Sequence, residues 1–179
     1  MKKHEARQAL VETASRLFYT QGYNNTGINQ VLEESGIVKS TMYQNFRSKE
    51  DLLLVYLQVA GEQTNDALAA AAAKGKTPRQ KVLAVFDYLE ELVQQKGYYG
   101  CNFLNIISEM PKDARRVRKQ IKKQKDGVRE LFAAILEPIH KADLADEIYT
   151  LFEGALIGNK VHDDVWPVTS AKKIVSKII

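Results

Sequence analysis

The sequence predicts an all-α protein. Apolar residues recur at helical spacing along nearly all of its 179 residues, and 10 glycines and 4 prolines are too few for a turn-rich β fold. No segment shows the strict alternation of apolar and polar residues that indicates a half-buried strand. At this length, with 45% hydrophobic residues, the chain can bury a substantial core. We therefore expect helices throughout.

The first predicted helix is amphipathic and stops at Gly22, a residue that can take the left-handed conformation after a helix end. Its apolar stripe has the spacing i, i+4, i+7, i+8 and consists of Leu10, Ala14, Leu17 and Phe18. Thr26 is expected to cap the next helix, which ends at Gly36. The segment 1–36 therefore predicts two helices joined by a turn.

A third, short helix is expected over about 38–46. Val38, Met42 and Phe46 fall at i, i+4 and i+8 and should face the core, which leaves a polar face outside. Ser48 and Asp51 then read as a capping box in which the Asp51 carboxylate reaches back to the Ser48 amide. This box opens a long helix that runs through an alanine tract to about Gly75.

The remaining helices are predicted from caps and periodicity. Thr77, Pro78 and Gln80 have the types of an N-cap, a first-position proline and a capping-box partner. The expected helices cover 78–95, 101–110, 113–140, 143–162 and Pro167 to the end. Pro138 should kink or end its helix because it lacks an amide hydrogen.

The two short helices around Gly36 have the sequence form of a helix-turn-helix. The DNA major groove admits one helix, and hydroxyl, lysine and glutamine side chains suit phosphate oxygens and base edges. Lys49 lies in the first turn of the next helix, where unpaired backbone amides favour a phosphate. A polar face on so short a helix is more often only a solvated face, so this pattern alone does not decide for DNA.

At these residues the chain resembles a family. The stretch "TGINQVLEESGIVKSTMYQNFRSKEDL", preceded by "LFYTQGYNNT", is similar to the DNA-binding signature of TetR-family transcriptional regulators. The resemblance implies a helix-turn-helix domain over 1–50 and a helical regulatory domain over 51–179, with the helix of about 49–74 as connector. It also implies a homodimer that forms through the last two helices, and an unidentified small-molecule effector. The DNA contacts implied are Thr26, Lys39, Ser40, Thr41, Tyr43, Gln44, Asn45 and Lys49.

The function that the resemblance implies is a ligand-responsive regulator, most often a repressor, that binds a palindromic operator. The lack of a long apolar run and the charged N-terminal residues separately predict a cytoplasmic location. Val38 departs from the family pattern because valine cannot cap the third helix. The alternative therefore stays open that the chain is a helical ligand-binding or protein-interaction module whose helix-turn-helix no longer reads DNA.

The second half suggests a dimer seam and a pocket. The helix of 144–162 has apolar residues on two faces and contains Gly154 and Gly158, which predicts close packing against a second copy, with a purely intrachain core as the alternative. The resemblance places an effector pocket among helices 78–160. Large or polar residues that could line it are Phe86, Tyr88, Leu89, Cys101, Phe103, Asn105, Ile107, Glu109, Met110, Tyr149, Phe152 and Trp166. For most of them, plain core is the stronger interpretation, and for Cys101 an inert thiol.

Other classes are disfavoured. The net charge of +4 permits a polyanionic partner without requiring one, and a single cysteine forbids an internal disulfide. No apolar run is long enough to span a membrane. The segment "AAAAKGKT" lacks the first glycine of a phosphate loop, and neighbouring His162, Asp163 and Asp164 cannot share one metal. We expect no enzyme activity, cofactor or metal site, and we interpret the basic tract 112–129 as a solvated helix face.

Overall fold

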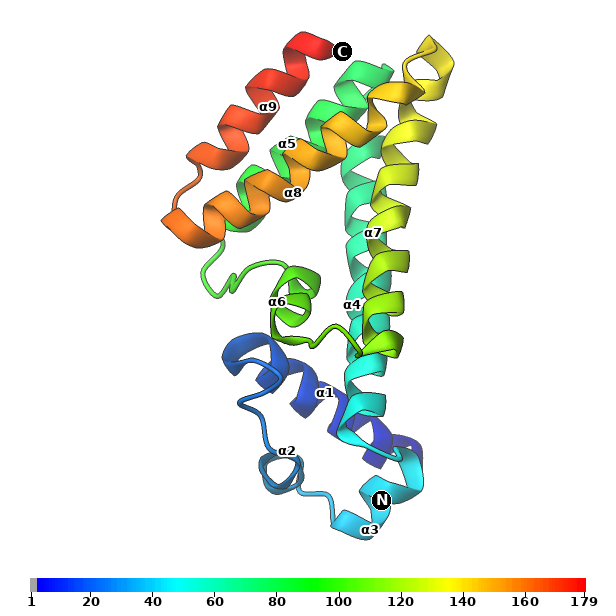
Figure 1. The fold of residues 1–179 in the computed structure, drawn as a ribbon, viewed down its shortest axis with the longest axis vertical. Coiled ribbons are helices and arrows are strands. Elements are labelled where there is room, and N and C mark those ends of the chain that lie inside the picture. The colour runs from blue at the N-terminus through cyan, green and yellow to red at the C-terminus, as the bar shows by residue number, and fades with distance from the viewer. Residues whose placement is uncertain (1–2) are drawn as a thin grey trace. The chain divides into compact units, whose positions relative to one another are not determined.

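The computed structural model describes residues 3–179, and within this range the chain consists of helices and connecting turns with no strand (Figure 1). The fold class predicted from the sequence is confirmed. The contacts divide the chain into two compact units. Unit 1 contains the residues up to Gly61 together with Asn102–Lys122, and unit 2 contains Glu62–Cys101 and Lys123–Ile179. Two of the helices, α4 and α7, contribute residues to both units.

Unit 1 is built around the three N-terminal helices. These are α1 (Lys3–Gln21), α2 (Ile28–Ser35) and α3 (Lys39–Asn45), and α1 packs against both α2 and α3. The first part of α4 (Lys49–Ala73), α6 (Asn102–Glu109) and the start of α7 (Arg115–Leu136) complete the unit. Its core contains the predicted α1 stripe, with Leu10 and Ala14 fully buried. The ring of Phe18 makes edge contacts with Tyr23 and Tyr56.

Unit 2 contains the C-terminal helices and the rest of α4 and α7. Its other elements are α5 (Pro78–Val93), two 3₁₀ turns η1 (Glu137–Ile139) and η2 (Ala142–Leu144), α8 (Ala145–His162) and α9 (Trp166–Ile178). Helix α9 packs along α8 and α5 (Figure 1). Three phenylalanines, Phe86, Phe132 and Phe152, form the aromatic centre, with ring centroids 5.8–6.4 Å apart.

Several predicted helix ends are confirmed. Thr77 accepts a hydrogen bond from the Gln80 amide, and the Gln80 side chain accepts one from the Thr77 amide, which completes the predicted capping box. Helix α7 ends at Leu136, and Pro138 lies in the following 3₁₀ turn. Gly22 has φ +92° directly after α1, as its predicted role requires. These positions combine residue types that fit few other conformations, which explains why the sequence located them.

Three local predictions were wrong. The N-cap of α2 is Gly27 and not Thr26, because the Thr26 hydroxyl instead donates to the Gly22 carbonyl at 2.7 Å. The Asp51 carboxylate accepts a hydrogen bond from the Arg47 amide and not from the Ser48 amide, although the Ser48 hydroxyl does cap the Asp51 amide. Val38 is 65% exposed, because as the extended N-cap residue of α3 it lies outside the helical periodicity that buries Met42.

The packing of α8 depends on one of its two glycines. A Cβ on Gly158 would lie 2.8 Å from the Cβ of Pro167 in α9, whereas a Cβ on Gly154 would meet nothing within 4 Å. The close approach that we predicted for both glycines is therefore made only by Gly158 within the chain. Between residues 3 and 179, no helix has both the length and the apolar character that crossing a membrane requires.

Candidate nucleic-acid interface

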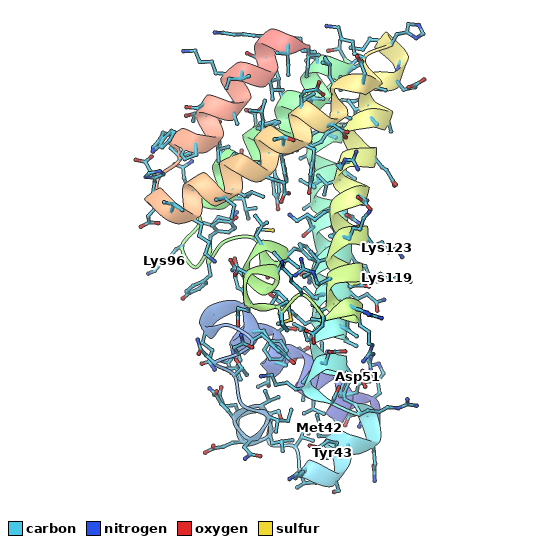
Figure 2. The ribbon with its side chains drawn as sticks, in the orientation of Figure 1. Met42, Tyr43, Asp51, Lys96, Lys119 and Lys123 are labelled. Atoms are coloured by element: carbon cyan, nitrogen blue, oxygen red, sulfur yellow. The ribbon has the colours of Figure 1, made fainter. Side chains whose placement is uncertain are left out.

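Helix α3 is held by two buried residues and presents a polar face. Met42, labelled in Figure 2, is fully buried and Phe46 is 4% exposed, and together they fix the helix on the core of unit 1. Tyr43 is 49% exposed. The side chains of Lys39, Ser40 and Gln44 are exposed as well. The predicted division of α3 into an anchored side and an open side is thus present in the structure.

The other predicted contact residues of the helix-turn-helix are less accessible. Thr41 and Asn45 are half-buried, and the Asn45 side-chain amide donates to the Thr41 carbonyl at 2.8 Å. Thr26 is fully buried, and its hydroxyl oxygen also accepts a hydrogen bond from Gln21 at 3.1 Å. In this structure the Thr26 hydroxyl stabilises the turn between α1 and α2.

Lys49 also bonds within the protein. Its Nζ donates to the carbonyl of Tyr23 at 2.7 Å and to the carbonyl of Thr26 at 2.8 Å. The same ammonium lies 4.0 Å from the centroid of the Tyr23 ring, a cation–π arrangement. Burial lowers the pKa of Lys49, and the negative charge of Glu109 opposes that shift. Lys49 therefore joins the start of α4 to the α1–α2 turn.

Glu109, the last residue of α6, holds the same turn from the other side. Its carboxylate accepts hydrogen bonds from the backbone amides of Tyr23 at 3.2 Å and Asn24 at 2.7 Å. The side-chain amide of Asn24 in turn donates to the Glu109 carbonyl at 3.2 Å. A Cβ on Gly22 would lie 2.9 Å from Oε1 of Glu109, so the glycine is needed for this approach as well as for its positive φ. We refer to these contacts as the Glu109 clamp.

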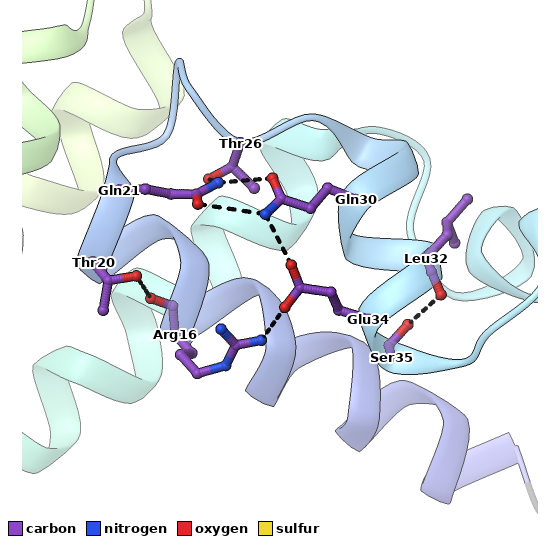
Figure 3. Close-up of polar contacts among 8 residues, drawn as sticks. All are labelled: Arg16, Thr20, Gln21, Thr26, Gln30, Leu32, Glu34 and Ser35. Atoms are coloured by element: carbon purple, nitrogen blue, oxygen red, sulfur yellow. Dashed lines mark hydrogen bonds and ion pairs between the residues drawn. The ribbon is translucent and has the colours of Figure 1, made fainter.

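A polar network fixes α2 against α1, as Figure 3 shows. Arg16 forms an ion pair with Glu34, and the Gln30 side chain donates to the other Glu34 oxygen at 2.9 Å. Gln21 donates to the Gln30 side chain at 2.8 Å. The hydrogen bond from Arg16 lowers the pKa of Glu34, with a smaller contribution from Gln30. The network spans the two helices that precede α3 and so sets the position of the turn that leads into it.

Sequence reasoning missed the arginines beside α3. Arg7, Arg47 and Arg116 line an open pocket of about 540 Å³ at the junction of α3 and α4. Arg116 bonds Glu50 at 2.8 Å and Asp51 at 2.7 Å, whereas the side chains of Arg7 and Arg47 are exposed. The available signal was weak, since Arg47 lies within the quoted stretch but directly after the predicted third helix, and Arg7 and Arg116 are far from it in sequence.

The residues predicted to line an effector pocket fall into both units. Phe103, Asn105, Ile107, Glu109 and Met110 belong to unit 1, and the other seven belong to unit 2. Phe86, Leu89, Phe103 and Phe152 are buried in the cores, whereas Trp166 is 50% exposed. Tyr88 lines an open depression of about 870 Å³ on α5. The structure thus brings together Phe86 and Phe152 and gives core positions to four of the twelve residues, while the others are half-buried or exposed.

Cys101 and Tyr149 lie near a buried ion pair of unit 2. Lys125 Nζ is 2.7 Å from Oε1 of Glu153 and 3.5 Å from Sγ of Cys101. The side chains of Lys125 and Glu153 are only 12% and 17% exposed. Burial, with a smaller contribution from the Glu153 charge, raises the pKa of Tyr149 to about 12.

Comparison with known proteins matches the N-terminal part of the chain to a family of regulators. Residues 10–56 match the model described as bacterial regulatory proteins, tetR family. The chain is 30% identical over 122 residues to the HTH-type transcriptional regulator YuxN of Bacillus subtilis, a match that covers 64% of this chain and 41% of YuxN. It is 23% identical over 192 residues to the HTH-type transcriptional repressor NemR of Escherichia coli, which covers 99% of this chain and 95% of NemR. The match to YuxN therefore covers about two fifths of that protein, whereas the match to NemR covers nearly all of NemR.

Solved structures agree over almost the whole chain. A TetR-family transcriptional regulator from Streptomyces coelicolor superposes with a TM-score of 0.90 at 24% identity, covering 98% of this chain and 90% of that one. The reduced form of E. coli NemR superposes with a TM-score of 0.86 at 23% identity, covering 96% and 95%. At these identities the likeness establishes the fold. Residues 10–56 thus match the tetR family of bacterial regulatory proteins, and the chain as a whole has the fold of TetR-family regulators.

Proposed function

We propose that the protein is a sequence-specific DNA-binding transcriptional regulator that acts as a homodimer on a palindromic operator. The observation that carries this proposal is the form of α3, a short helix anchored by buried Met42 and Phe46 with an open polar face. A helix of this kind can enter the major groove, where lysine and glutamine recognise base edges and hydroxyls bond phosphates. The side chains that would read DNA are Lys39, Ser40, Thr41, Tyr43, Gln44 and Asn45.

The role of Lys49 and Thr26 in this proposal is to position the reading helix. Both bond the α1–α2 turn, so their effect on DNA would pass through the placement of α2 and α3. The Lys49 ammonium would need to leave two carbonyl oxygens before it could bind a phosphate. Lys49 would therefore support DNA binding by holding the helix-turn-helix in position, and its charge would not contact the DNA.

Dimerisation through α8 and α9 is supported by apolar side chains left on their surface. Ile157 and Val161 of α8 are 44% and 71% exposed, and Trp166 and Ile174 of α9 are 50% and 47% exposed. A two-fold symmetric contact between copies would cover this face. The two copies of α3 would then read half-sites in successive major grooves, about 34–36 Å apart.

A ligand-responsive repressor is the form of regulation that we favour. NemR, which is similar to this chain over nearly its whole length, is named as a repressor. An effector would act by binding more tightly to a conformer in which the two copies of α3 no longer match successive grooves. The side chains that could form its pocket in unit 2 are those around Tyr88, Cys101 and Tyr149, and the protein would act in the cytoplasm.

The proposal is tested by selecting bound sequences from a random DNA pool with the purified protein. Enrichment of a palindrome is expected, and recovery of only salt-sensitive background would instead indicate a protein or ligand-binding module that does not read sequence. Tyr43→Ala should weaken binding to the selected site at unchanged helix content. Tyr99→Ala is the matched control, because Tyr99 is similarly exposed, at 51%, but lies in unit 2.

The dimer is tested by light scattering at micromolar concentration. The wild-type protein should have the mass of two chains, and Val161→Glu should lower that mass because it places a charge in the apolar face. Ala69→Glu introduces the same charge at an exposed position of α4 and should leave the dimer intact. A wild-type mass of one chain, 20.2 kDa, would contradict this part of the proposal.

A further inference from the structure

The pocket beyond the C-terminal end of α3 is continuous with the face proposed to read DNA. Asn45 and Phe46, the last residue and the C-cap of α3, form part of its lining, and Ser48 and Asp51 of the α4 start form another part. The guanidinium carbon of Arg7 lies 5.3 Å from the centroid of the Phe46 ring. Phe46 is buried, so this stacking holds an α1 arginine at the edge of the reading helix.

The acidic groups of the pocket already have partners. Asp51 accepts hydrogen bonds from the Arg116 guanidinium and from the Arg47 backbone amide, and Arg116 also bonds Glu50. The Arg116 hydrogen bond is the largest influence that lowers the pKa of Asp51, so this carboxylate stays ionised and paired. In the described part of the chain, no carboxylate forms an ion pair with Arg7 or Arg47. The Arg47 charge contributes to the lowered pKa of Asp51, but both guanidiniums are exposed and can still reach an external anion.

The length of α3 indicates that this external anion is a phosphate of the DNA backbone. A seven-residue helix is about 10 Å long, and the major groove is about 12 Å wide. Groups directly beyond the end of such a helix reach the sugar–phosphate wall of the groove rather than more base edges. Arginine suits that position because its planar fork binds phosphate oxygens through two parallel hydrogen bonds.

We infer that Arg7 and Arg47 form a second contact of this protein with DNA, in which they bind backbone phosphates flanking the bases read by α3. The inference rests on the proposed function. It assigns backbone affinity to two arginines that are not among the DNA contacts implied by the family resemblance, whereas Lys49 bonds protein carbonyls. Bases would be read by α3, and the arginine pocket would add affinity that does not depend on sequence.

The test is the salt dependence of binding to the selected palindrome by the full-length protein. Each phosphate contact contributes about 0.9 to the slope of log K against log salt, so a fourfold rise in salt weakens binding about 3.5-fold per contact. A dimer loses two contacts for each substituted position. Arg7→Gln and Arg47→Gln should each reduce the slope by about 1.8, and the double variant by about 3.6. Affinity for random DNA should fall by the same factor as affinity for the palindrome.

Two matched variants separate charge at this pocket from other effects. Lys96→Gln removes one positive charge from an exposed position of unit 2 and should leave the slope unchanged. Arg7→Lys keeps the charge but not the planar group over Phe46, and it should retain the wild-type slope. Hydroxyl-radical footprinting should show protection lost only at the flanks of the site in the double variant.

Three results would overturn the inference. The first is a wild-type slope in the double variant, and the second is an equal change in Lys96→Gln, which would indicate a general effect of net charge. The third is loss of discrimination between palindrome and random DNA at an unchanged slope, which would indicate that the arginines only position α3. Selection of no palindrome by the wild-type protein is a separate outcome, because it overturns the proposed function itself.

Discussion

Substitution of Gly22 should reveal how strongly the Glu109 clamp holds the turn between α1 and α2. Gly22→Ala introduces two costs. The left-handed backbone, with φ +92°, costs an L-residue about 1–2 kcal/mol. The new Cβ would also lie 2.9 Å from Oε1 of Glu109, so the carboxylate has to move away.

The second cost can be worked out from the hydrogen bonds of the clamp. Movement of the carboxylate breaks its 2.7 Å bond to the Asn24 amide, and a bond to a charged group contributes about 1.5–3 kcal/mol, whereas the longer 3.2 Å bond to the Tyr23 amide adds little. The sum for Gly22→Ala is therefore about 2.5–5 kcal/mol. Glu109→Ala breaks the same bonds without backbone strain and should cost about 1.5–3 kcal/mol.

A double-mutant cycle separates the two costs. In Glu109→Ala the carboxylate is gone, so adding Gly22→Ala should cost only the backbone term of about 1–2 kcal/mol. The double variant should be more stable than the sum of the single effects predicts, by about 1.5–3 kcal/mol. The assay is urea unfolding followed by circular dichroism at one fixed protein concentration, because the stability of the proposed dimer would depend on concentration. Additivity within about 0.5 kcal/mol would refute the clamp as a stabilising contact.

Three further predictions concern other parts of the chain. Thr77→Ala should lower the free energy of unfolding by about 1 kcal/mol in the same urea assay, because it removes the N-cap of α5. Thr169→Ala is the control and should cost less, because the Thr169 hydroxyl bonds only a carbonyl within α9. Lys49→Met should cost about 1.5–3 kcal/mol through loss of its two bonds to carbonyls, and a stability equal to wild type would contradict that role. Since the pKa of Tyr149 is raised to about 12, the folded state keeps a proton that the unfolded chain loses above about pH 10, so stability should fall as pH rises from 10 toward 12. In an absorbance titration of the 8 tyrosines, Tyr149→Phe should remove the fraction that ionises at the highest pH.

The order and bounds of the helices were predictable because their ends are marked by local chemistry. Thr77 and Pro78 define the start of α5, and Pro138 limits α7, by interactions that involve only neighbouring residues. The same reasoning failed at Val38, because the helical spacing was continued to a residue that is the extended N-cap and not part of the helix. The outward face of α3 was predictable as well, since burial of Met42 fixes the opposite side.

The contacts around α3 could not be predicted, because they join residues that are distant in sequence. Glu109 meets Tyr23 across 86 positions, and Arg116 meets Glu50 across 66. No local pattern indicates that a carboxylate of α6 holds a turn after α1. The bonds of Lys49 to the carbonyls of Tyr23 and Thr26 could not be predicted for the same reason, because these partners lie more than 20 positions away in the sequence.

The discontinuous make-up of unit 1 limits how this protein can be recombined with its relatives. A chimera that exchanges only the first 61 residues would import an α1–α2 turn without the Glu109 that bonds it, and an α4 start without Arg116. The transplanted segment would also lose its packing against α6, whose Phe103 and Ile106 are buried in the core of unit 1. A functional exchange of operator preference between two such regulators should therefore carry residues 102–122 together with the N-terminal helices, or be confined to the exposed positions of α3.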